Sequence, residues 1–286
     1  MTGADLPSLR RQLAVAIYDE LHAGRQPLDV PPGWSLRDPE VEVRLRDALP
    51  HHETARDVRV LDVGPERALV RLDGVRVWVA RTAVAARQGP VRAGAVATVL
   101  IPASRPALSP GFFLADGTRP CSGGEPVVRV YVHLITAEAA HRVWGAVHGL
   151  LAELGIGYRA KVVSWSAMLP RRDGFVVYLA ERDREVAGRI AAVARQVPGV
   201  GPMSSVFAEP LAPGVAIAWE PADPRPAMAG MSFGEHRATA LADGLVHYAE
   251  RCADGAPACV YDSVRRAFTQ AGIDPGNPAR NLALRP

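Results

Sequence analysis

Apolar and polar residues alternate strictly in residues 127–135, which read Val-Val-Arg-Val-Tyr-Val-His-Leu-Ile. A period of two residues predicts a β-strand with two different faces. One face carries valine and leucine, and the other carries Arg129, Tyr131 and His133. We therefore expect a strand that buries one face and presents polar groups on the other.

The spacing of apolar residues becomes helical between positions 137 and 155, which predicts a helix that ends at Gly155. Residues 158–165 and 175–179 predict two further strands. A strand, a helix and a strand with short connections predict a parallel pair joined by a crossover. In that arrangement the strand faces that carry Arg129 and Lys161 lie next to each other.

The first half of the chain has a different pattern. Leucine and isoleucine at helical spacing predict an amphipathic helix over residues 6–21, and residues 40–49 predict a shorter helix. Short apolar runs at 58–63, 68–72 and 75–80 are separated by Gly-Pro and Asp-Gly. Such runs predict an antiparallel meander.

Glycine and proline cluster in residues 116–126, which predicts a boundary between two parts of the chain. The expected parts are a helix and meander subdomain, residues 1–126, and an α/β subdomain, residues 127–286. Further helices are expected over residues 182–197, 234–252 and 259–271. The expected fold class is α+β, with an antiparallel meander plus helices in the N-terminal half and a mixed sheet containing a β-α-β unit in the C-terminal half.

Composition indicates a globular protein, because 48% of the 286 residues are hydrophobic and 22% are charged. The chain has no long apolar run and no secretory signal at its start, so we expect a cytoplasmic protein with no membrane segment. Basic residues are interleaved with acidic ones at a net charge of +3, which argues against a nucleic-acid partner. Three cysteines without metal-ligand spacing predict reduced thiols and no metal site, and a bridge between Cys252 and Cys259 is the alternative.

Lys161 is the single lysine among 33 basic residues, and it lies in the middle of a predicted strand. Lysine is depleted in strands. Unlike arginine, lysine can lose its proton inside a protein and act as a base. Lys161 is therefore the candidate general base of an active site.

The predicted loop and strand that follow Lys161 bring further polar groups toward the same sheet face. The candidate site for an anionic substrate consists of Lys161, Arg129, Tyr131, His133, Arg171 and Tyr178. A purely structural interpretation stays open, in which the histidine is partly buried, the tyrosine belongs to the core and the arginines are on the surface.

Ser232 stands where a helix is predicted to begin, so its side chain is expected to cap that helix. The free amide groups of a helix start can bind an anion, and Arg237 lies about one turn further on. A capped helix without a binding role is the alternative.

Four segments carry a resemblance to a known family: residues 100–114, 171–178 (Arg-Arg-Asp-Gly-Phe-Val-Val-Tyr), 213–221 and 232–237. They resemble the signature segments of the type III effector Hop A family, whose actinobacterial members are stand-alone lyases of class V lanthipeptide and thioamitide biosynthesis. The resemblance implies a lyase that works after a separate kinase. Such a lyase eliminates phosphate from phosphoserine or phosphothreonine of a ribosomally made precursor peptide, which leaves dehydroalanine or dehydrobutyrine. It needs no metal or organic cofactor.

A more distant similarity to the phosphothreonine lyases implies roles for single residues. His133 corresponds to the acid, Lys161 to the base, and Arg171 and Tyr178 to groups that bind phosphate and orient the substrate. Those lyases have a lysine two residues before the histidine, where this chain has Tyr131. The resemblance therefore implies that Arg129, or another arginine such as Arg237, binds the phosphate in its place.

Two other functions stay open. One is a non-catalytic subunit that binds a phosphopeptide or a leader peptide, in which Lys161 is dispensable. The other is an effector-like protein that binds host or regulatory proteins. The family resemblance implies a separate kinase as partner, and residues 1–126 contain no phosphate loop for ATP that would place the kinase in this part of the chain. Val77, Trp78 and Val79 are candidates for its docking surface, and burial of the three in a core is the alternative.

Overall fold

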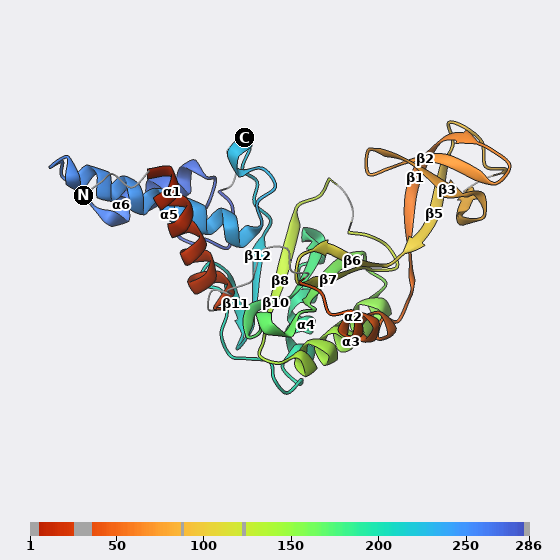
Figure 1. The fold of residues 1–286 in the computed structure, drawn as a ribbon, viewed down its shortest axis with the longest axis horizontal. Helices are drawn as coiled ribbons and strands as arrows, with labels where there is room; N and C mark the ends of the chain where they lie inside the picture. The colour runs from red at the N-terminus through yellow and green to blue at the C-terminus, as the bar shows by residue number, and fades with distance from the viewer. Residues whose placement is uncertain (1–5, 26–35, 87–88, 122–123, 283–286) are drawn as a thin grey trace.

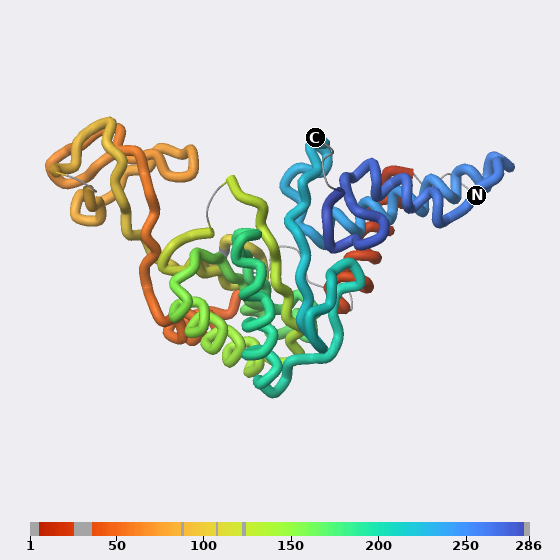
Figure 2. Tube along the Cα trace, turned by 180° about the vertical axis from the view of Figure 1, so that it is seen from behind, coloured from red at the N-terminus to blue at the C-terminus, as the bar shows by residue number. Residues whose placement is uncertain are grey.

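The computed structural model describes residues 6–25, 36–86, 89–121 and 124–282. A central seven-stranded sheet is flanked by two smaller parts (Figure 1). One is a five-stranded sheet within residues 53–102, here called the β-wing, and the other is a helical lobe that contains residues 6–23 and 233–270. Figure 2 shows the two parts rising on opposite sides of the central sheet. The expected α+β class is confirmed.

The first helix follows the predicted apolar spacing. It comprises α1 (Leu6–Ile17) and a π-helical continuation, η1 (Tyr18–Ala23), and it ends at Gly24 with a left-handed φ of 64°. A residue without a Cβ adopts this conformation at little cost, which explains why the helix stops there.

None of the described helices is long and apolar enough to cross a membrane.

The β-wing confirms the predicted meander. Its strands are β1 (Glu53–Val63), β2 (Arg67–Leu72), β3 (Val75–Ala80), β4 (Val84–Ala86) and β5 (Val96–Pro102), in the order β3-β2-β1-β5-β4. Asp73 and Gly74, with φ of 50° and 82°, form the two-residue turn between β2 and β3. The valines and alanines of one sheet face form a separate small core.

The central sheet has the order β11-β12-β8-β10-β9-β7-β6, and every strand pair is antiparallel. Its strands are β6 (Ser104–Ser109), β7 (Phe112–Asp116), β8 (Val127–Leu134), β9 (Tyr158–Val163), β10 (Arg171–Ala180), β11 (Glu209–Ala212) and β12 (Val215–Trp219). Strands from both sides of residue 126 pair in this sheet, so the predicted boundary does not separate two sheets.

The expected parallel pair is wrong in one respect. The strands β8 and β9 run in the same direction, but they are not neighbours, because β10 pairs with both of them. A short 3-10 turn, η3 (Ser166–Met168), returns the chain after β9. The strand β10 then enters between β8 and β9, where its apolar residues are buried on both faces. The sheet is therefore antiparallel, and the crossover spans a gap of one strand.

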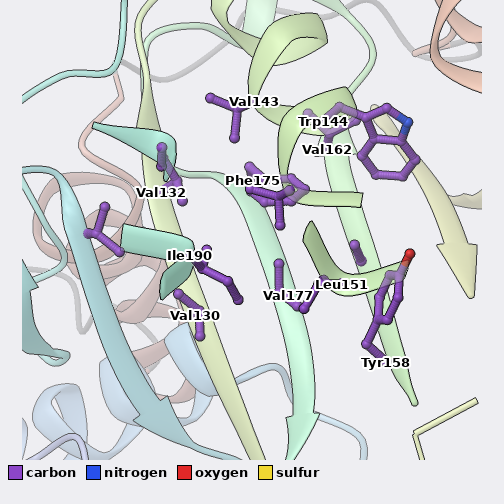
Figure 3. Packing of buried hydrophobic residues seen from close by; sticks show 14 of the residues in the cluster. Val130, Val132, Val143, Trp144, Leu151, Tyr158, Val162, Phe175, Val177 and Ile190 are labelled. Carbon is purple, nitrogen blue, oxygen red and sulfur yellow. The ribbon is translucent and has the colours of Figure 1, made fainter. Parts of the chain in front are cut away.

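One face of the central sheet packs on helices. The predicted apolar face of β8 lies under α3 (Ala137–Leu154) and α4 (Val186–Ala194), as Figure 3 shows for Val130, Val132 and Ile190. Trp144 is fully buried there, and its indole nitrogen donates a hydrogen bond to the carbonyl of Leu45 in α2 (Pro39–Asp47). This layer packs against the sheet behind its polar face.

Part of the opposite face is covered by the helical lobe. The helix α5 (Phe233–Ala253) packs with α1 and with α6 (Val260–Gln270), and Phe233 contributes to a core with Tyr131 and Ala216. Residues of β9 and β7 on the same face instead line two cavities, one against the start of α5 and one against the β-wing. The polar groups of interest lie at these cavities.

Candidate functional site

Two predicted site residues, Arg129 and Tyr178, form a row across the sheet with Arg159. Arg129 of β8 is opposite Tyr178 of β10, which is opposite Arg159 of β9. Residues directly opposite on adjacent strands share a face and touch. The guanidinium carbon of Arg129 lies 4.9 Å from the centre of the Tyr178 ring, a cation–π contact.

Arg129, Lys161 and Tyr178 line one cavity of about 310 Å³, here called the Lys161 cavity. Its other side is formed by Glu220, Asp223 and the residues at the start of α5, including Ser232. The structure thus brings together the central sheet and the helix start that the sequence analysis selected independently.

Lys161 lies on β9, half-buried, opposite Val176 of β10. Its ammonium is 4.4 Å from the centre of the Phe112 ring, and the guanidinium carbon of Arg171 is 5.2 Å from the same ring. Among the described residues Lys161 forms no ion pair within 4.0 Å. The single lysine therefore shares the Phe112 ring with another cation and has no neutralising carboxylate in contact among the described residues.

Arg129 is 7% exposed, and its Nε and Nη2 both donate to the carboxylate of Glu220. A guanidinium has five N–H donors, so this pair leaves donors on Nη1 for a further acceptor. Glu220 is more exposed than Arg129, with a side chain that is 37% accessible. Glu220 thus fixes the Arg129 guanidinium at the wall of the cavity.

The predicted cap at Ser232 is confirmed. Ser232 accepts a hydrogen bond from the Glu235 amide, and Glu235 accepts one from the Ser232 amide, so the two form a capping box. Arg237 is fully buried beneath this start, where it donates to the Pro278 carbonyl and the Asn281 side chain. The structure gives Arg237 a place in the lobe's interior and not in the wall of the cavity.

Arg171 also lies away from the cavity wall, in a buried polar cluster. Its Nε and Nη2 donate to the two oxygens of Asp173 at 2.7 Å and 2.8 Å, and Nη2 donates to the Tyr18 hydroxyl at 3.1 Å. His22 Nε2 is 3.7 Å from Asp173, and His22 Nδ1 is 2.8 Å from the Ser205 hydroxyl. We call Tyr18, His22, Arg171, Asp173 and Ser205 the buried cluster.

The charges of this cluster are set by burial and by each other. Burial lowers the pKa of His22 to about 4, which keeps the imidazole neutral near pH 7. Burial alone would raise the pKa of Asp173, but Arg171, His22 and Lys161 together hold it well below its usual range. Asp173 is therefore an anion that compensates Arg171 and acts electrostatically on Lys161.

His133 is on the same sheet face as Arg129, but it does not line the Lys161 cavity. Its Nδ1 accepts a hydrogen bond from the Met203 amide, and its ring covers Gly201, where a Cβ would lie 2.3 Å from the ring. Burial, together with Arg172, lowers the pKa of His133. This favours the neutral imidazole, whereas the sequence analysis expected an imidazolium acid.

Tyr131 lies behind the cavity. It is 2% exposed, and its ring is 5.3 Å from the His22 ring and 5.9 Å from the Phe233 ring. Its hydroxyl is buried and interacts electrostatically with the Arg129 guanidinium. No group of three or more possible metal ligands occurs in the described part of the chain.

The sequence analysis did not select four residues that lie at or behind the candidate site: Phe112, Glu220, and Tyr18 and His22 of η1. Phe112 and Glu220 do fall within segments 100–114 and 213–221, which carried the family resemblance. Tyr18 and His22 are four residues apart beside the apolar positions 17 and 21, so helical spacing was a signal that they face the same core.

Comparisons with known proteins agree with this fold. A comparison of the sequence with curated proteins gives no match. The effector protein from Pseudomonas syringae pv. syringae strain 61 has a similar structure, with a TM-score of 0.50, 13% identity, and coverage of 96% of this chain and 97% of that one. The effector protein from Pseudomonas syringae pv. tomato strain DC3000 has a TM-score of 0.52 and 13% identity over 96% and 95% of the chains. Residues 103–280, more than half of the chain, match the HopA1 effector protein family, and the chain therefore belongs to that family.

Proposed function

We propose that this protein is a phosphoserine/phosphothreonine lyase that acts on a ribosomally made precursor peptide, as in lanthipeptide and thioamitide biosynthesis. The observation that carries the proposal is the position of Lys161. It is the one lysine of the chain, it lines a cavity with Arg129 and Tyr178, and it has no ion pair within the described residues.

The reaction requires a base at the α-carbon of the phosphorylated residue. Lys161, as a neutral amine, takes the α-proton, and the electrons of that C–H bond form the double bond between Cα and Cβ. The Cβ–O bond breaks, and phosphate leaves with its electron pair. Arginine at position 161 would remain protonated, so the reaction explains why lysine stands there.

The departing phosphate needs positive groups near its oxygens. Arg129 supplies the donors that Glu220 leaves free, and the start of α5 at Ser232 adds the positive end of a helix. Tyr178, stacked on Arg129, orients the phosphorylated residue between them. In this proposal Arg171 does not contact the substrate. It forms an ion pair with Asp173 and packs on the Phe112 ring, which Lys161 also contacts.

A separate kinase is the proposed partner. Trp78, on the edge strand β3, is 51% exposed, and Val75 on the same strand is 62% exposed. An edge strand offers unpaired backbone groups to a partner, and exposed aromatic residues are frequent anchors of protein interfaces. The β-wing is therefore the proposed docking surface, whereas Val79 packs on the core of the wing.

Incubation with a phosphorylated precursor peptide tests the proposal. The expected result, by mass spectrometry, is loss of one phosphoric acid from each phosphorylated residue, with no dependence on ATP. The alternative function, a phosphopeptide-binding subunit, predicts binding that depends on Arg129 without any change in mass. Unchanged peptide at enzyme concentrations that saturate binding would support that alternative and contradict the lyase.

A further inference from the structure

A second cavity adjoins the Lys161 cavity. It has a volume of about 550 Å³ and is lined by residues of the β-wing and the central sheet. Tyr178 and Glu220 belong to the walls of both cavities. A substrate held at Lys161 therefore meets the second cavity directly beyond Tyr178.

The floor of the second cavity is built around one buried carboxylate. Asp116 is 1% exposed and is contacted by three guanidinium groups, from Arg159 at 2.7 Å, Arg105 at 3.1 Å and Arg56 at 3.9 Å. These arginines come from β9, β6 and β1, so the cluster joins the wing to the sheet.

The cluster has more positive than negative charge. Among the described residues the three guanidinium groups form ion pairs with two carboxylates, Asp116 and Asp73, and the Asp73 side chain is 61% exposed. The other two carboxylates in the wall of this cavity, Glu125 and Glu220, are paired with Arg182 and Arg129. Nη2 of Arg105 is buried and donates no hydrogen bond. The Arg56 side chain is 11% accessible, so an incoming anion reaches Arg56 by replacing the more exposed Asp73 carboxylate.

We propose that Arg56 and Arg159 form a second anion subsite, which binds an acidic or phosphorylated side chain of the same substrate peptide. Arg159 is two strands away from Arg129 in the same row, a distance of about 10 Å at the usual strand spacing. An extended peptide covers this distance in about three residues. The subsite therefore selects peptides with an anionic residue about three positions from the residue that loses phosphate. This inference rests on the proposed function.

Binding of synthetic peptides tests the subsite. The probes are fluorescent alanine- and glycine-based nonapeptides with a central phosphothreonine analogue, in which a methylene group replaces the bridging oxygen and prevents elimination. Glutamate, glutamine or phosphoserine is placed three residues before or after the centre. A parallel set carries unphosphorylated threonine. Fluorescence anisotropy gives the Kd of each peptide for the full-length protein.

The expected result is a Kd about tenfold lower for glutamate than for glutamine at one of the two positions, the size of one charge-assisted contact. A still lower Kd with phosphoserine would identify a second phosphate as the preferred group. Arg159→Gln should remove the preference, and Arg56→Gln should reduce it. Arg142→Gln, which changes an exposed ion pair on α3, should leave the preference intact.

The outcomes separate the two proposals. A preference for glutamate in the unphosphorylated set as well, with no gain from the central phosphonate, would support the subsite and contradict the proposed function. Equal Kd values for glutamate and glutamine at both positions would overturn the subsite. So would a preference that survives in both Arg159→Gln and Arg56→Gln. Arg159→Lys retains a charge beside Asp116 and should keep most of the preference, and Arg56→Gln carries the test if Arg159→Gln does not fold.

Discussion

Arg171 donates two hydrogen bonds to Asp173, at 2.7 Å and 2.8 Å, in a place where each side chain is less than 5% exposed. Both charges are thus removed from water and compensate each other. The same pair anchors η1 through Tyr18 and His22. The N-terminal helix is therefore fastened to the sheet directly behind the Lys161 cavity.

Asp173→Asn should destabilise the protein strongly. Loss of one partner leaves the Arg171 charge buried without compensation, which costs about 3–5 kcal/mol. Because the pKa of Asp173 is lowered in the folded protein, this stability is present above the unfolded pKa of about 4 and is lost as the pH falls further. Urea unfolding should therefore show a constant difference from wild type between pH 8 and 5, which narrows below pH 4.

Glu138→Gln is a matched control for that experiment, since it breaks an exposed ion pair with Arg142. It should change the free energy of unfolding by less than about 1 kcal/mol. An Asp173→Asn variant as stable as this control would show that the buried pair does not hold η1.

His22 should make stability depend on pH in a different range. Its pKa is lowered to about 4 in the folded protein, so between the unfolded pKa of 6.5 and 4 the unfolded state binds more protons. Stability from neutral His22 is thus complete above pH 6.5 and falls with pH, by about 3 kcal/mol at pH 4.5. His148, whose pKa burial lowers to about 3, acts in the same direction.

Urea unfolding at pH 7 and pH 4.5 measures this effect. His22→Gln should lose less stability than wild type between the two pH values, and His148, His133 and His236, whose pKa values burial also lowers, should contribute to the remainder. His52→Gln, at an exposed position, should behave as wild type does. If His22→Gln has the same pH dependence of stability as wild type, His22 binds as many protons in the folded state as in the unfolded state between pH 7 and pH 4.5, which contradicts a buried neutral imidazole.

Most elements of the fold were predictable because each has a local signal. Strict alternation in 127–134 identified β8 and both of its faces, and Gly155 ended a helix where expected. The order of strands was not predictable in this way. Whether β9 pairs with β8 or leaves room for β10 depends on contacts between distant segments, and the local patterns are the same in both arrangements.

The candidate site was predictable only in part, for the same reason. The alternation correctly placed Arg129, Lys161 and Tyr178 on one face. It did not show that Arg171 and Arg237 are buried with partners of their own, because those partners include Tyr18 and residues 278–281, which are distant in the sequence. Sequence spacing also left His133 near Lys161, although the loop around Gly201 encloses its ring.

Glu220→Gln should strengthen phosphopeptide binding. The carboxylate of Glu220 occupies two donors of Arg129 and repels an incoming phosphate. Its removal frees the guanidinium, so the Kd should fall by about threefold to tenfold. Glu209 lies on β11 and forms an ion pair with Arg280. Glu209→Gln breaks this ion pair and should leave the Kd unchanged. Weaker binding by Glu220→Gln would show that Arg129 needs this partner to hold its position.

Trp78→Ser tests the docking surface on the β-wing. The ring is half-exposed, so the substitution should leave the free energy of unfolding nearly unchanged. Loss of an interface anchor should nevertheless prevent co-elution with the cognate kinase in size-exclusion chromatography at micromolar concentration. Tyr261→Ser, at an exposed aromatic residue of α6, is the control. Co-elution that persists with Trp78→Ser would place the kinase elsewhere.

The most direct measurement is elimination of phosphate by variants of Lys161. Mass spectrometry of a phosphorylated precursor peptide should show complete loss of phosphoric acid with wild type. Lys161→Arg and Lys161→Ala should both leave the phosphorylated peptide, with a rate lower by at least about 10²-fold, while binding persists in Lys161→Arg. Elimination by Lys161→Arg at a rate near that of wild type would contradict the assignment of Lys161 as the base.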